Sequence, residues 1–133
     1  GKYAKDTHLE LVRAMFRTVG EVYDLPEKHF PAFGALGGAS GAFVFLYIDA
    51  LASAGVKAGL PRAQAQAIAV QATLGGALLA QQSAEHPIAL MDQVCSPGGT
   101  TIEGVHALKR LGFETAVQQA IDAIIEKDKR LAQ

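Results

Sequence analysis

Tryptophan is absent from the 133 residues, cysteine occurs once, and only 19% of the side chains are charged. A single cysteine, Cys95, excludes an intrachain disulfide and favours a reducing, cytoplasmic setting. The formal net charge is −1, and the lysines and arginines are not interleaved with aromatic residues, which argues against nucleic acid as a partner. His8, His29, His86 and His106 share no metal-ligand spacing, so we expect no metal site.

Two long stretches, residues 32–48 and 63–84, carry no charge. In the first, we expect four glycines between positions 34 and 41 to break any long helix. The second contains five glutamines, whose amides would be costly in hydrocarbon. We therefore expect neither stretch to span a membrane.

Half of the residues are apolar and only 19% are charged, which is little charge for the surface of so short a chain, so we expect a face buried against a second copy or a missing domain. Residues 61–82 are mostly alanine, glutamine, glycine and leucine. Gly75 and Gly76 lie within this predicted helix, where each glycine costs about 0.5–1 kcal/mol relative to alanine. Close approach of another helix would offset that cost. The pattern favours an intertwined homodimer, and an ordinary buried helix within one monomer stays open as the alternative.

The apolar spacing predicts helices over residues 5–18, from 43 to a stop at Gly59, and over 61–82, 87–94, 101–111 and 113–131. Pro26 and Pro31 bracket a turn or short helix. Residues 21–25 alternate polar and apolar side chains and predict one short strand. A lone strand cannot satisfy its own backbone, so it would belong to a sheet that this chain does not contain. With Gly1 in place of an initiator methionine, this pattern leads us to expect a piece of a longer protein.

Residues 95–103 read Cys-Ser-Pro-Gly-Gly-Thr-Thr-Ile-Glu. Thr100 followed by Glu103 matches a capping box and predicts the start of a helix. Gly98 and Gly99 allow a tight bend with outward-pointing amides, and Ser96 and Thr101 add hydroxyl groups. These neutral donors at a helix N-terminus suit an anion such as a carboxylate. From the spacing alone, a plain turn and cap remains the alternative.

Three segments together resemble the pyrroline-5-carboxylate reductase family. They are residues 95–101, the stretch Gly-Val-Lys-Ala-Gly-Leu-Pro-Arg at 55–62, and the Glu-His-Pro turn at 85–87. All three occur in the family's order and spacing, and the resemblance covers nearly the whole chain.

The resemblance implies an all-α, intertwined dimerisation domain at residues 32–133, similar to the C-terminal domain of 6-phosphogluconate dehydrogenase-like reductases. Residues 1–31, a helix plus a short strand, would be a remnant of an absent Rossmann domain. Members of the family reduce 1-pyrroline-5-carboxylate to L-proline with NADPH or NADH. By resemblance, Ser96, Gly98, Gly99, Thr100 and Thr101 bind the substrate carboxylate. Thr101 would be the catalytic residue, close to the ring nitrogen.

The sequence departs from the family at Gly41, where proline is common before the first long helix. No Gly-x-Gly-x-x-Gly fingerprint is present, so we expect the chain to bind no dinucleotide and to be inactive alone. We expect a homodimer and leave open a larger ring of dimers. Two other functions stay open, which are a helical dimerisation module of a different NAD(P)-dependent oxidoreductase and a stand-alone carboxylate-binding protein.

Two further residues carry side chains that could take part in chemistry. Cys95 has no evident base nearby, so we expect a small buried residue and not a nucleophile. Glu85 is interpreted as a solvated turn residue, with a place facing the site across a dimer as the alternative.

Overall fold

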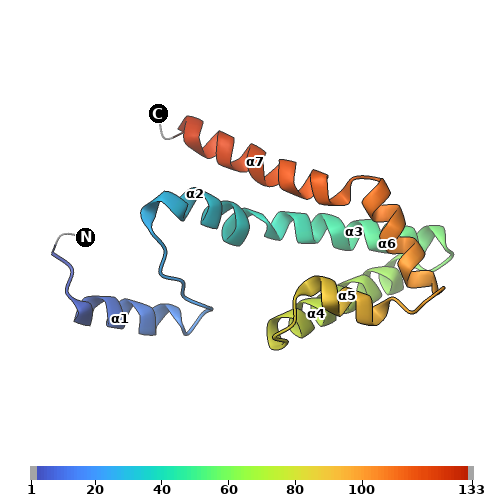
Figure 1. Cartoon of the computed structure of the whole chain (residues 1–133), viewed down its shortest axis with the longest axis horizontal. Helices are drawn as coiled ribbons and strands as arrows, with labels where there is room; N and C mark the ends of the chain where they lie inside the picture. Colours follow the sequence, from blue (N-terminus) through green and yellow to red (C-terminus); the bar gives the residue numbers. More distant parts are fainter. Residues whose placement is uncertain (1–2, 132–133) are drawn as a thin grey trace. The chain divides into compact units, whose positions relative to one another are not determined.

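The computed structural model describes residues 3–131, and every regular element within that range is helical (Figure 1). The elements are α1 (Asp6–Phe16), a 3-10 turn η1 (Glu27–His29), α2 (Phe30–Phe33), a π-helical segment η2 (Gly34–Ala39), α3 (Gly41–Lys57), α4 (Arg62–Gln82), α5 (Pro87–Val94), α6 (Thr100–Arg110) and α7 (Phe113–Leu131). The all-α prediction is confirmed, and α5 and α7 begin and end at the predicted residues.

The internal contacts divide the chain into two units, residues 1–30 and 31–133. In the first unit, Arg13 on α1 donates to Asp24 at 3.3 Å from Nε and pairs with both Asp24 and Glu10. Hydrogen bonds to Asp24 and then Glu10 raise the pKa of Arg13 above its ordinary value. This network holds the segment after α1 against its own helix.

The short strand predicted at residues 21–25 is wrong, because these residues are irregular. A strand is stable only beside another strand that shares its backbone hydrogen bonds. Residues 3–131 include no strand that could serve as that neighbour. The alternating side chains alone therefore do not produce the element.

The predicted glycine break between positions 34 and 41 is also wrong. A single apolar helix runs from Glu27 to Lys57, and by length and composition it could cross a membrane. The glycines change the helix locally instead of ending it, because residues 34–39 take the wider π-helical turn. Only 11% of the apolar window in this helix is buried, so its side chains need cover from outside the chain.

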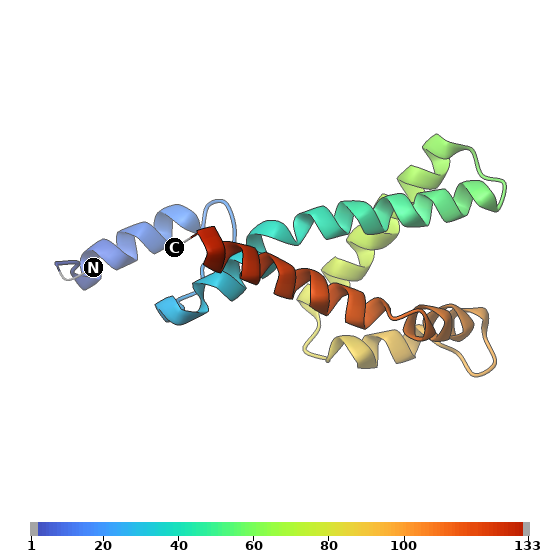
Figure 2. The same cartoon turned by 90° about the horizontal axis from the view of Figure 1, so that it is seen from above.

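In the second unit, α4 packs against α3, and Figure 2 shows the two helices crossing. The link between them is a Schellman motif. Gly59 has φ of +103°, the Leu60 amide donates to the Gly55 carbonyl at 3.0 Å, and the Gly59 amide donates to Val56. Gly59 is thus the helix stop that the sequence predicted.

The core between α3 and α4 is made of small side chains. Ala52, Ala65 and Ala69 are buried there, with Ile48 packed against them. Gly55 is the closest point, since a Cβ at this position would lie 3.1 Å from the Ala65 Cβ. Because an alanine methyl contributes only about 0.8 kcal/mol when buried, this core supplies little hydrophobic free energy.

Candidate functional site

The loop between α5 and α6 is a tight bend closed by one backbone hydrogen bond. Cys95 leaves the helical conformation after α5, and its amide donates to the Asp92 carbonyl at 3.1 Å. Gly98 has φ of +68°, a conformation that glycine adopts at no steric cost. The Gly99 amide then donates to the Ser96 carbonyl at 3.0 Å, so this amide is used inside the bend and is not free for a ligand.

Gly99 must lack a side chain for a specific reason. A Cβ at this position would overlap the Ser96 hydroxyl and would lie 3.0 Å from the Ser96 carbonyl oxygen. Because Gly99 is the residue before α6, the Ser96 hydroxyl lies beside the start of that helix. The two residues together place a side-chain donor next to the first turn of α6.

The predicted capping box at Thr100 and Glu103 is wrong. Gly99 is the N-cap residue, it makes no side-chain cap, and Thr100 is already the first helical residue. A capping box needs its threonine one position earlier, outside the helix. As a result, the Thr100 and Thr101 amides have no acceptor within the part of the chain that is described.

The predicted site residues lie together and are open to solvent. Ser96, Gly98, Thr100 and Thr101 are exposed and Gly99 is half-buried. This segment is therefore open to solvent on the side of the residues predicted to bind the anion.

The segments that form this loop carry no lysine or arginine. No lysine or arginine occurs between Arg62 and Lys109, and Glu103 is the acidic residue in the first turn of α6. A bound carboxylate would be held by amides, hydroxyls and the positive end of the helix dipole. Such a site can bind and orient a small acid.

The turn before α5 contains polar contacts that sequence reasoning missed. His86 is the N-cap of α5, and its Nδ1 accepts from the Ile88 amide at 3.2 Å. The Ser83 hydroxyl accepts from the Glu85 amide at 3.0 Å. The Glu85 carboxylate accepts from the Gln93 side-chain amide, which lies at the other end of α5. Glu85 is exposed, as predicted, but it is not simply solvated.

Cys95 and the metal-ligand residue types add no further chemistry to the loop within the part of the chain that is described. Cys95 is half-buried and forms no disulfide. Within residues 3–131, no three His, Cys, Asp or Glu side chains come together in a group that could hold a metal ion.

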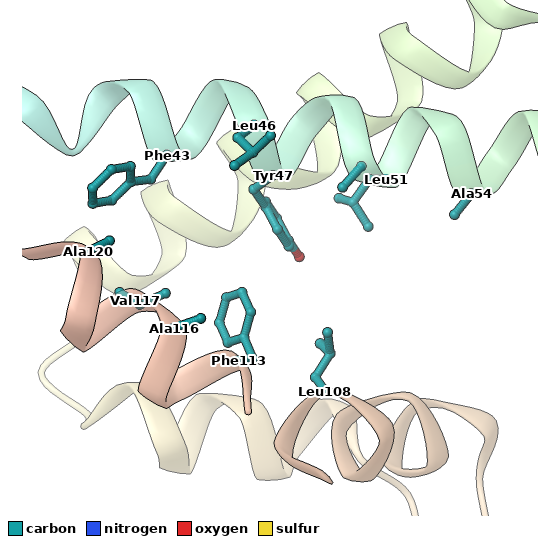
Figure 3. Close-up of a pocket in the computed structure, with 11 residues that line it drawn as sticks. Phe43, Leu46, Tyr47, Leu51, Ala54, Leu108, Phe113, Ala116, Val117 and Ala120 are labelled. Carbon is teal, nitrogen blue, oxygen red and sulfur yellow. The ribbon is translucent and has the colours of Figure 1, made fainter. Parts of the chain in front are cut away.

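A second feature of this unit is a large apolar groove of about 560 Å³. Figure 3 shows Phe43 and Tyr47 of α3 facing Phe113 and Val117 of α7, with Leu108 of α6 at one end. The Tyr47 and Phe113 ring centroids are 6.4 Å apart. Periodicity placed these residues on helices but gave no sign of how the helices meet, so the groove was not predicted.

Comparison with known proteins gives a consistent result. The family described as pyrroline-5-carboxylate reductase dimerisation matches residues 27–131. A pyrroline-5-carboxylate reductase from Synechocystis is 42% identical over 98% of this chain and 49% of its own length. The Escherichia coli reductase is 44% identical over 89% of this chain and 44% of its own length.

A solved structure has the same fold. The Plasmodium falciparum pyrroline carboxylate reductase, with NADP bound, superposes with a TM-score of 0.91 at 30% identity, covering 100% of this chain and 54% of that one. This chain therefore spans about half the length of the relatives that it matches.

Proposed function

This chain belongs to the pyrroline-5-carboxylate reductase family, and from that premise we propose that it is the dimerisation and substrate-binding part of an enzyme that reduces 1-pyrroline-5-carboxylate to L-proline with NADPH or NADH. The observation that carries the proposal is the α5–α6 loop. It combines the family's Ser-Pro-Gly-Gly-Thr-Thr sequence at residues 96–101 with two exposed threonines whose amides have no internal acceptor.

We assign each site residue a role in holding the substrate. The Thr100 and Thr101 amides and the Ser96 hydroxyl bind the carboxylate, and Gly98 and Gly99 shape the bend that presents them. The Thr101 side chain lies close to the ring nitrogen. Positioning supplies much of the rate in such a reaction, since the imine carbon has to be held near its hydride donor with little freedom.

The reductant is not held by the residues described here. The sequence has no two glycines separated by one residue, and residues 3–131 contain no strand to precede a phosphate-binding turn. We therefore propose that a dinucleotide-binding domain supplies it, with residues 1–31 joined to that domain and residues 32–133 forming the dimer. A single free cysteine supports a cytoplasmic setting.

We also propose that two copies of the chain pair through their apolar faces. The four buried residues of the described chain are all alanines, whereas Phe45 and Leu46 on α3 are 73% and 71% exposed. The family model, which describes a dimerisation domain, matches the whole apolar helix from Glu27 to Lys57. This match supports burial of the helix against protein and not against lipid. Assembly of dimers into a larger ring stays a prediction.

A chimera tests the enzymatic proposal. This chain would replace the matching C-terminal part of the Escherichia coli reductase, which is 44% identical to it. We expect NADPH- or NADH-dependent formation of L-proline from 1-pyrroline-5-carboxylate. A folded, dimeric chimera without turnover would contradict the proposal and favour a dimerisation module of another oxidoreductase.

Thr101 is tested in the same chimera. Thr101→Val removes the hydroxyl at nearly constant shape, and we expect turnover to fall about tenfold or more through loss of orientation. Thr101→Ser keeps the hydroxyl and should retain most of the activity. Thr115→Val, at an exposed threonine on α7, is the matched control and should change nothing. Full activity of Thr101→Val would remove Thr101 from the site.

A further inference from the structure

Few interactions hold the loop at residues 95–99. Two backbone hydrogen bonds, Cys95 to Asp92 and Gly99 to Ser96, are local and define its shape. Neither of them fixes where the loop lies relative to the rest of the unit. That position depends on the two helices that the loop joins, α6, which contacts α7, and α5.

α5 is short, and its attachment to its neighbour is slight. It has eight residues, and isolated helices of that length are not stable in water. Between it and α4 lies an open groove lined by residues of both helices, including Leu90, Met91 and Val94 of α5. Val94 at the end of the helix is 62% exposed. Val94, at the end of the helix, is therefore the most exposed large apolar side chain of α5.

One side-chain hydrogen bond reaches the last turn of α5. The Gln93 side-chain amide donates to the Glu85 carboxylate, which belongs to the turn before the helix. That turn is itself ordered, because Ser83 and His86 each accept a backbone amide there. Within residues 3–131, no other side-chain hydrogen bond involves the last turn of α5 or the loop after it.

We propose that Gln93 is a positioning residue, which acts with Glu85 to fix the end of α5 and so the carboxylate-binding loop. The inference rests on the proposed function for its effect on KM. Gln93 does not touch the substrate in this account. It limits the movement of Cys95 and Ser96, and through them the placement of the amides at the start of α6.

The kinetic test uses the chimera described above. We expect Gln93→Ala to raise the KM for 1-pyrroline-5-carboxylate about 2- to 10-fold, the range for loss of one net hydrogen bond, with kcat within about twofold. Glu85→Ala should have the same effect, and the double variant should be no worse than either single one. Glu85→Gln, whose carbonyl can still accept from Gln93, should restore the wild-type KM. The control Gln82→Ala, an exposed glutamine at the end of α4, should leave KM unchanged.

A second measurement separates this inference from the proposed function. Nitrogen-15 relaxation of the Gly98, Gly99, Thr100 and Thr101 amides in the present chain reports loop order without any turnover. We expect lower order in Gln93→Ala and wild-type order in Glu85→Gln, with an unchanged melting temperature. If the wild-type chimera is inactive, the proposed function fails, and these amides still decide the role of Gln93. Unchanged loop order and unchanged KM in Gln93→Ala would overturn the inference.

Discussion

At Gly99, a methyl group would have to occupy space that Ser96 already fills. A Cβ there meets the Ser96 hydroxyl and lies 3.0 Å from the Ser96 carbonyl oxygen. We expect Gly99→Ala to displace that hydroxyl and to widen the bend, because the contact with the backbone oxygen cannot relax by a rotamer change. The affinity for L-proline in the chimera should fall about tenfold or more, since a shift near 1 Å misplaces the donors.

Gly104 provides the matched control at the residue scale. It lies within α6, and a Cβ at this position meets nothing within 4 Å. Gly104→Ala should therefore leave L-proline affinity unchanged and stabilise the helix by up to about 1 kcal/mol. Titration calorimetry compares the two variants. Equal affinity in Gly99→Ala and Gly104→Ala would show that the bend does not place the ligand donors.

The sequence predicted which residues form the loop, but not the role of each one within it. Gly98 and Gly99 were predicted to form a tight bend with outward-pointing amides. The bend is present, with Gly98 at φ of +68°, but the Gly99 amide points into it and donates to the Ser96 carbonyl, so that part of the prediction was wrong. Thr100 was misplaced by one position, because a threonine at the N-cap and one at the first helical residue give the same local pattern. The hydrogen bond between Glu85 and Gln93 could not be predicted, since it depends on rotamers of two exposed side chains eight residues apart.

At the scale of elements, α3 and α4 approach each other most closely at Gly55. The Ala65 Cβ would lie 3.1 Å from a Cβ at that position, and Ala65 is buried and cannot rotate away. We expect Gly55→Val to destabilise the protein by about 1–3 kcal/mol through overpacking. Gly55→Ala should be much milder, because the gain in helix propensity offsets part of the strain. Chemical denaturation measures both variants.

Gly41 is the control for this helix pair. It begins α3, and a Cβ there meets nothing within 4 Å. Gly41→Ala should therefore keep or slightly raise the free energy of unfolding. A Gly55→Val protein as stable as wild type would mean that the two helices are free to separate and that the alanine core does not fix their distance.

Helix boundaries were predictable where the chain has a stop that works locally. Gly59 and Gly112 both have positive φ, and both were placed correctly as boundaries. The glycines between 34 and 41 have no such conformation, and there the chain continues as a π-helical turn. The helix stops and the π-helical segment both contain glycine, so the residue type alone does not tell them apart. Only the surrounding packing distinguishes a helix end from a wider turn. Residues 21–25 failed for a related reason, since a strand depends on partners outside its own pattern.

At the scale of the whole molecule, the main question is what buries the exposed apolar side chains of α3. The four buried residues of the described chain are alanines, whereas Leu46 is 71% exposed beside the groove between α3 and α7. Burying one leucine contributes about 1.5–3 kcal/mol, and a two-fold dimer counts each such contact twice. A second copy of the chain therefore gains more by covering this face than the alanine core supplies.

Leu46→Glu tests that conclusion directly. A carboxylate at this position would be buried without a partner in each half of the dimer, so we expect the dimer dissociation constant to rise about 100-fold or more. Lys127→Glu, in the charged end of α7, changes charge by a larger amount on an exposed face and should leave the dimer intact. Sedimentation equilibrium across nanomolar to micromolar concentrations measures both. A wild-type chain that stays monomeric, or a Leu46→Glu chain that pairs as tightly as wild type, would place the cover of α3 somewhere other than a second copy.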